Sequence, residues 1–109
     1  MIHKMKLKES PFERIKNGTK TIEFRLYDEK RQKVKIGDKI EFSKLPEIQE
    51  TLLVEVLDLY QEESFEKLFE KLYTDENEIK RKTNAMHEFY SPEEEKKYGV
   101  LGIKISLIN

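Results

Sequence analysis

The sequence contains no cysteine, and this absence excludes two kinds of site. Disulfide bonds and thiolate metal centres both require cysteine, so neither can stabilise this chain. Two histidines are present, His3 and His87, and they lack the close spacing of paired metal ligands. A metal site would have to draw carboxylates from distant segments. We therefore expect no metal and no cofactor, and we expect both histidines to lie at the surface.

The sequence also lacks any hydrophobic run long enough to cross a bilayer. Apolar runs such as Leu52-Leu53-Val54 fall far short of the roughly 20 residues that a membrane span needs. The first residues, Met1–Lys6, do not contain the apolar segment of a secretory signal. We expect a soluble, cytoplasmic protein with no membrane partner.

The sequence also has no large excess of positive or negative charge. Charged residues make up 39% of the chain, yet the formal net charge is only −1, because both signs are interleaved. Proteins that bind any polyanion usually have a strongly basic surface, so this class is disfavoured. A local basic cleft is still compatible with this net charge, because net charge does not report how charges are distributed. Sequence signatures of serine-triad hydrolases, phosphate-binding glycine loops and zinc proteases are absent.

Four strands are predicted in the first part of the chain, at Ile2–Leu7, Thr19–Leu26, Lys39–Ser43 and Thr51–Tyr60. The last of them is rich in branched residues, which favours a central position in the sheet. A short helix is predicted between the first two strands. Its start resembles a capping box at Ser10–Glu13, and Asn17-Gly18 is a helix-stop signal.

Helices are predicted in the second part of the chain. Ser64 precedes apolar residues at helical spacing, and a less apolar helix is expected over Asp75–Tyr90. Ser91–Glu94 is a second capping box, so the acidic run Glu93–Glu95 is interpreted as structural charge at a helix start. A final strand is expected over Val100–Ile108.

The predicted order is strand, helix, three strands, helices and a last strand, within a single domain of residues 1–109. Short strands interrupted by helices in this way are typical of an α+β fold. The last strand must return to pair with an early one. We therefore expect a small barrel-like sheet of about five or six strands with interspersed helices.

The strand after the first predicted helix carries an unusual density of charge, written Gly18-x-Lys20-x-x-Glu23-x-Arg25. Period-two geometry places Ile22, Phe24 and Leu26 on the buried face and Thr21, Glu23 and Arg25 on the other. Arginine presents a planar fork for carboxylate, phosphate or a base edge, and a partly desolvated lysine can act as a base. From spacing alone, the alternative is a solvated strand face whose charges only pair with each other.

Four tyrosines are further candidates for ligand contact. Their rings can stack on nucleic-acid bases, or they can pack in the core or at its rim, which is the more common role for a tyrosine. These residues are Tyr27, Tyr60, Tyr90 and Tyr98.

Three segments together resemble the ASCH domain family. They are Gly18-x-Lys20-x-x-Glu23-x-Arg25, then Ile36-Gly37-Asp38, and finally Tyr98-Gly99 with the strand that follows. The resemblance extends from Met5 to Leu107 and implies a fold similar to the PUA domain, a small β-barrel with helices between its strands. It also implies RNA or nucleotide binding in a cleft that Gly18, Lys20, Glu23 and Arg25 would line.

One branch of that family hydrolyses acetylated cytidine with a lysine, a threonine and a more distant glutamate. The resemblance places Lys20 at the lysine position, whereas Glu23 stands where that branch has threonine, and Thr21 is only a neighbour of that position. Glu76 is the nearest candidate for the distant acid. The catalytic alternative therefore uses Lys20, Glu23 and Glu76, with water as nucleophile. A third possibility is an interaction domain without a ligand cleft, and the oligomeric state is left open.

Overall fold

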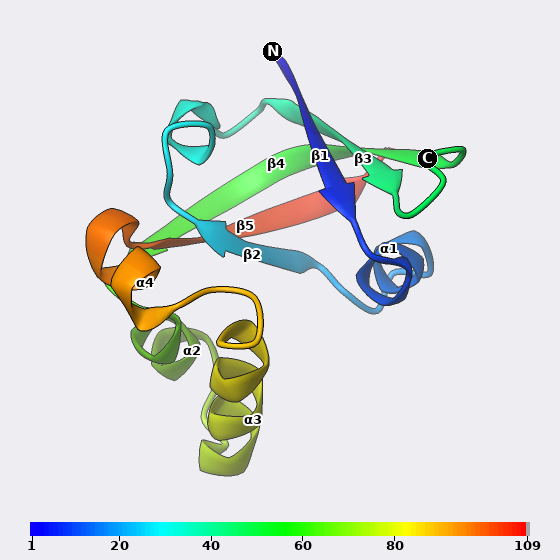
Figure 1. Ribbon diagram of the computed structural model, residues 1–109. Coiled ribbons are helices and arrows are strands. Elements are labelled where there is room, and N and C mark those ends of the chain that lie inside the picture. The colour runs from blue at the N-terminus through cyan, green and yellow to red at the C-terminus, as the bar shows by residue number, and fades with distance from the viewer. Residues whose placement is uncertain (109) are drawn as a thin grey trace. The chain divides into compact units, whose positions relative to one another are not determined.

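The computed structural model describes residues 1–108 (Figure 1). Its strands are β1 (Ile2–Leu7), β2 (Ile22–Leu26), β3 (Lys39–Lys44), β4 (Thr51–Glu62) and β5 (Val100–Leu107). Its α-helices are α1 (Glu9–Lys16), α2 (Phe65–Leu72), α3 (Glu76–Met86) and α4 (Pro92–Tyr98), and a 3-10 helix covers Arg31–Lys33.

The strands form one mixed sheet in the order β1-β3-β4-β5-β2. β1 runs parallel to β3, with His3 opposite Ile40, and β3 runs antiparallel to β4. β4 occupies the middle of this order, as its branched residues predicted. The last strand returns to lie beside the early strand β2. The predicted α+β class with a barrel-like sheet is confirmed.

The chain divides into two compact units. The first unit contains residues 1–23, 34–59 and 103–108, and the second contains residues 24–33 and 60–102. The single domain over residues 1–109 stays a prediction.

Alternating side chains of β1, β3 and β4 form the interior of the first unit. This is the period-two pattern of strands with one buried face. Phe12 and Ile15 of α1 add to it. The buried apolar residues of this unit are Met5, Leu7, Phe12, Ile15, Val34, Ile40, Phe42, Leu52, Val54, Val56, Ile103 and Ile105.

His3 shares the buried face of β1, so its predicted surface position is wrong. The residue is only 8% exposed, whereas Ile2 is exposed. Burial is tolerated because His3 Nε2 lies 2.8 Å from Asp38 Oδ2. This hydrogen bond holds the pKa of Asp38 below its usual value, and a hydrogen bond from the backbone N–H of Lys35 makes the next largest contribution. The turn between Ile36 and Asp38 is thereby connected to β1.

The start of α1 differs from the prediction. The helix begins at Glu9 after Lys8, and no described side chain caps it. Ser10 and Pro11 therefore lie inside the first turn, where proline removes no intrahelical hydrogen bond. The predicted stop is confirmed, since Gly18 has a positive φ of 85° directly after α1.

Apolar and aromatic side chains of α2 form the interior of the second unit. Phe65, Leu68 and Phe69 are buried together with Leu26 and Val100. The Phe65 and Tyr90 rings stack with their centroids 5.6 Å apart. Tyr60, Tyr90 and Tyr98 all pack against this cluster, so core packing accounts for these three tyrosines.

The predicted helix caps of the second unit are confirmed, although one helix is shorter than expected. Ser64 accepts a hydrogen bond from the Lys67 N–H, and Ser91 forms the capping box of α4 with Glu94. α3 ends at Met86 instead of Tyr90, and residues 87–89 form a turn.

Glu95 does more than supply negative charge at a helix start, which was the role predicted for the acidic run Glu93–Glu95. Its side chain is only 8% exposed. Oε1 accepts a hydrogen bond of 2.9 Å from the Phe65 N–H, and Oε2 lies 3.0 Å from His87 Nε2. One carboxylate of α4 therefore satisfies the first N–H of α2 and contacts the turn after α3.

Gly99 allows the end of α4 to lie directly against the end of β4. Its φ is +74°, and a Cβ at this position would lie 3.0 Å from the Glu62 carbonyl oxygen. Its N–H donates to the Glu95 carbonyl at 2.7 Å, and its own carbonyl accepts from the Tyr27 N–H at 3.0 Å. Only glycine satisfies both the backbone angle and the close approach.

We predict that Gly99→Ala destabilises the protein more than Gly37→Ala. Both glycines have positive φ, but the position of a Cβ on Gly37 is open. The loss at Gly37 should therefore be about 1 kcal/mol, whereas steric contact should raise the loss at Gly99 to about 2 kcal/mol or more. Urea denaturation of the two variants measures this difference, and equal losses would contradict the close approach.

Glu95→Ala should lower the free energy of unfolding by about 2–3 kcal/mol, because a buried N–H loses its acceptor. Glu93→Ala is the matched control, since Glu93 is an exposed acid on the same helix. Its effect should stay within about 0.5 kcal/mol. Thermal or chemical denaturation of both variants tests the prediction, which fails if the two variants lose the same stability.

Candidate functional site

The end of α1 determines the backbone position of Lys20. The Arg14 carbonyl oxygen accepts hydrogen bonds from the Thr19 N–H at 2.9 Å and from the Lys20 N–H at 3.0 Å. Asn17 Oδ1 accepts two more from Thr19, from its N–H at 3.0 Å and its hydroxyl at 2.7 Å. Gly18 allows the chain to turn here, because its φ of +85° favours glycine. Lys20 therefore starts from a well-defined backbone.

Lys20 and Glu23 form an ion pair that is largely sheltered from solvent. Lys20 Nζ lies 3.4 Å from Glu23 Oε1, and their side chains are 13% and 7% exposed, respectively. Desolvating two charges is costly, and their mutual attraction offsets much of this cost only when they pair closely. Within the first unit, the structure thus brings together the side chains of Lys20 and Glu23.

The burial of Glu23 corrects the predicted faces of β2. Ile22 and Phe24 are half-buried, whereas Glu23 is buried and Leu26 is buried as expected. Alternation assigns a charged residue to the exposed face because it counts only the hydrophobicity of single residues. The pairing with Lys20, three positions earlier and before the strand begins, compensates for the burial of Glu23.

Arg25 and Glu76 belong to the second unit. Arg25 is half-buried, and it follows Glu23 by two positions in the same strand. Glu76 is exposed at the first position of α3, where Asp75 accepts hydrogen bonds from two backbone N–H groups. An acid at this position is favoured by the positive end of the helix dipole.

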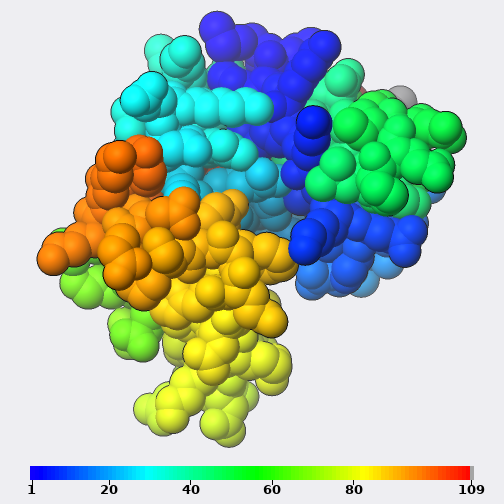
Figure 2. Space-filling model, in the orientation of Figure 1, coloured from blue at the N-terminus to red at the C-terminus, as the bar shows by residue number. Residues whose placement is uncertain are grey.

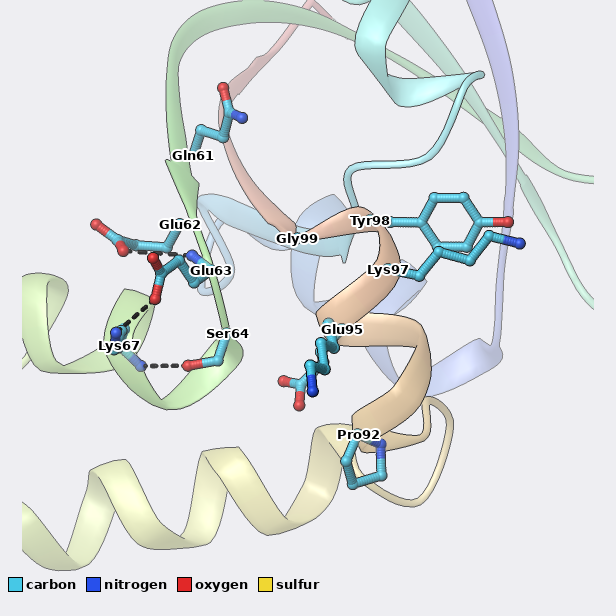
Figure 3. A pocket seen from close by; sticks show the side chains of 11 residues that line it. Gln61, Glu62, Glu63, Ser64, Lys67, Pro92, Glu95, Lys97, Tyr98 and Gly99 are labelled. Atoms are coloured by element: carbon cyan, nitrogen blue, oxygen red, sulfur yellow. Dashed lines mark hydrogen bonds and ion pairs between the residues drawn. The ribbon is translucent and has the colours of Figure 1, made fainter.

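A surface hollow of about 810 Å³ lies within the second unit, between the end of β4, the start of α2 and α4 (Figure 3). None of the described residues that line it belongs to the predicted site. Its lining consists of Gln61, Glu62, Glu63, Ser64, Lys67, Pro92, Glu95, Lys96, Lys97, Tyr98 and Gly99.

The carboxylates that line this hollow already have partners. Glu62 pairs with Lys71, and Glu63 pairs with Lys67. Glu95 is engaged by α2 and His87, as described above. In Figure 3, the Lys97 and Tyr98 side chains leave α4 on the side away from Glu95, and Lys97 Nζ lies 5.1 Å from the Tyr98 ring centroid. The hollow therefore has the character of a charge-compensated surface groove.

Two further features of the described residues 1–108 bear on function. They contain no group of three or more histidine, aspartate or glutamate residues placed to hold a metal ion. None of their helices combines the length and the apolar character that crossing a membrane requires.

Comparison with solved structures finds two proteins that match this chain along its length. The crystal structure of hypothetical protein PH0355 is 37% identical, with a TM-score of 0.84, and the match covers 99% of this chain and 100% of that one. The solution structure of protein PF0455 from Pyrococcus furiosus is 38% identical, with a TM-score of 0.74, and covers 100% and 99%.

A third solved structure shares the fold at low identity. It is a mutant of ZmASCH from Zymomonas mobilis, which is 12% identical with a TM-score of 0.66, covering 99% of this chain and 73% of that one. No curated protein matches the sequence. The family model of the ASCH domain matches residues 5–109, almost the whole chain. The chain therefore belongs to the ASCH domain family.

Proposed function

We propose that this protein binds RNA or a free nucleotide through the segment from Gly18 to Arg25. The observation that carries the proposal is the sheltered Lys20–Glu23 pair, in which Lys20 Nζ and Glu23 Oε1 lie 3.4 Å apart. Buried ion pairs contribute little net stability compared with apolar residues of similar size. A ligand-binding role gives such a pair a reason to be present, and ASCH domains are associated with RNA binding.

The two side chains offer complementary hydrogen-bonding groups. The Lys20 ammonium donates to a phosphate oxygen or to an acceptor on a base edge, and the Glu23 carboxylate accepts from the exocyclic amine of a base. Arg25 supplies a planar fork suited to phosphate. Gly18 leaves the backbone of the turn open, since no atom beyond Gly18 and its two chain neighbours lies within 4 Å of its ideal Cβ position.

The charge of the chain favours a short or single-stranded ligand. A formal net charge of −1 does not support a long electrostatic contact with duplex phosphates. Sequence-specific RNA recognition mainly targets unpaired bases, whose edges are accessible. We therefore expect base-edge contacts and one or two phosphate contacts to account for most of the affinity.

We predict that Lys20→Ala weakens binding to single-stranded RNA by about tenfold, the usual cost of losing a contact of this kind. The slope of log K against log salt should also decrease in magnitude by about 0.7, which corresponds to one lost phosphate contact. Fluorescence anisotropy over a series of salt concentrations measures both quantities, and a nucleoside and nucleotide panel identifies the smallest ligand.

Lys80→Ala is the matched control, because Lys80 is an exposed lysine of α3 and its loss changes the net charge equally. If both variants lose the same affinity, binding is nonspecific attraction to the surface. If no ligand changes the NMR shifts of residues 18–25 in the wild-type protein, the proposed function is wrong.

A second candidate function is hydrolysis of acetylated cytidine or a related modified nucleoside. The same pair supports it, because an amine and a carboxylate sheltered side by side can transfer a proton. In this reaction Lys20 or Glu23 removes a proton from water, which attacks the acetyl carbonyl. The bond to the exocyclic nitrogen then breaks, that nitrogen takes up the proton, and acetate and cytidine are released. Arg25 would orient the nucleoside, and Glu76 is the candidate for a distant acid.

If this reaction occurs, Lys20→Ala should reduce acetate release from N4-acetylcytidine by at least about a hundredfold, the usual contribution of a general acid–base group. Chromatographic detection of cytidine provides the measurement, with Lys80→Ala as the control for surface charge. Background rates in both the wild-type protein and Lys20→Ala would eliminate the hydrolase while leaving the binding proposal intact.

A further inference from the structure

One face of α1 carries three charged side chains at helical spacing. Glu9, Glu13 and Lys16 occupy positions i, i+4 and i+7, so they lie along the same side of the helix. The oppositely charged partners of these side chains come from the end of β3 and from the loop after it. In Figure 2 this loop, coloured green, lies directly against α1, coloured blue.

Lys44, the last residue of β3, is the centre of this group. Its Nζ lies 2.9 Å from Glu13 Oε2, 3.5 Å from Glu50 Oε1 and 3.9 Å from Glu9 Oε2. Lys16 Nζ lies 2.5 Å from Glu50 Oε2. These five residues, which we call the α1 clamp, therefore hold both ends of the helix to one segment of the first unit.

The contacts of the α1 clamp favour the charged forms of Lys44, Lys16 and Glu50. The hydrogen bond to Glu13 raises the pKa of Lys44, and the hydrogen bond to Glu50 raises the pKa of Lys16. The hydrogen bond from Lys16 lowers the pKa of Glu50. The contribution of Glu50 is therefore present at neutral pH and is lost only as the pH falls through this lowered value.

The helix that the clamp holds also positions the candidate site. The Arg14 carbonyl, in the last turn of α1, accepts the N–H groups of Thr19 and Lys20. A rotation or shift of α1 displaces this carbonyl and, with it, the backbone from which the Lys20 side chain starts. The connection from Lys44 to Lys20 thus consists of one helix and two hydrogen bonds.

A second face of α1 adds to the contacts of its buried residues. Phe12 and Ile15 are buried and set the depth at which the helix packs. The α1 clamp contributes charged contacts at both ends of another face, and contacts at two ends oppose rotation of the helix about its axis. Each exposed pair contributes little to the free energy of unfolding.

We propose that Lys44 is a positioning residue for the Lys20–Glu23 site and acts through the α1 clamp. This inference rests on the proposed function of that site. Lys44 does not contact the ligand in this proposal, so its effect must pass through Lys20. We therefore expect that replacing Lys44 changes binding more than it changes the stability of the protein.

Lys44→Met tests the proposal, because methionine keeps an apolar stem near the Phe12 ring but removes the charge. Lys67→Met is the matched control, since Lys67 forms an exposed pair with Glu63 within the second unit. We expect Lys44→Met to weaken RNA binding by about two- to fivefold, in keeping with the modest strength of exposed ion pairs. Lys67→Met should leave the affinity unchanged.

A double-mutant cycle distinguishes positioning from direct contact. If Lys44 acts through Lys20, adding Lys44→Met to Lys20→Ala causes no further loss of affinity. The same loss in both backgrounds would mean that Lys44 touches the ligand itself, and this outcome overturns the proposal. Lys16→Met tests the other end of the clamp and replaces Lys44→Met if that variant does not fold.

A measurement without ligand separates this proposal from the proposed function. NMR of the ligand-free protein should show shifted amide signals and faster hydrogen exchange at Thr19 and Lys20 in Lys44→Met, but not in Lys67→Met. If the wild-type protein binds no RNA, the proposed function fails while this measurement still decides the positioning. Unchanged amides at both residues would overturn the role of Lys44.

Discussion

A charge can be buried in this protein only where a partner compensates for it, and this constraint shapes both units. In the first unit, Glu23 lies beside Lys20 and His3 lies beside Asp38. In the second unit, the carboxylate of Glu95 accepts the first N–H of α2. Each of these groups occupies a position that an apolar residue would usually take in a sheet or helix interface. The pairs therefore connect segments that hydrophobic contacts alone would hold less specifically.

The candidate site, the Lys20–Glu23 pair, is one example of a buried charge with a compensating partner. Its lysine and glutamate lie close enough to form an ion pair, and in the proposed function a polar ligand engages the hydrogen-bonding groups of both. In the proposed function, a ligand with a phosphate and an exocyclic amine would replace this internal contact with one contact to each side chain. By contrast, Glu62 and Glu63 of the hollow beside α4 pair with exposed lysines, whereas both members of the Lys20–Glu23 pair are sheltered from solvent. This comparison is why we place function at the motif.

Helix α1 links the clamp to the site through its backbone. The clamp residues are partly exposed, so their contribution to stability is small, but their geometry restricts a helix whose last turn holds Lys20. A weak interaction can in this way influence binding without dominating folding. The sequence carries the signal for this arrangement in the spacing of Glu9, Glu13 and Lys16, which is recognisable as one helix face only after the start of α1 is known.

Local sequence patterns determined much of this protein: the β4 strand, the helix stop at Gly18, the serine caps of α2 and α4, and the family motif. These features depend on neighbouring residues, whose preferences are strong over a few positions. The tertiary structure alone decided which charges are buried. Alternation assigned Glu23 to the exposed face and composition assigned His3 to the surface, because neither rule includes a partner. Their compensating residues, Lys20 before the strand and Asp38 on a distant turn, come into contact only when the chain folds.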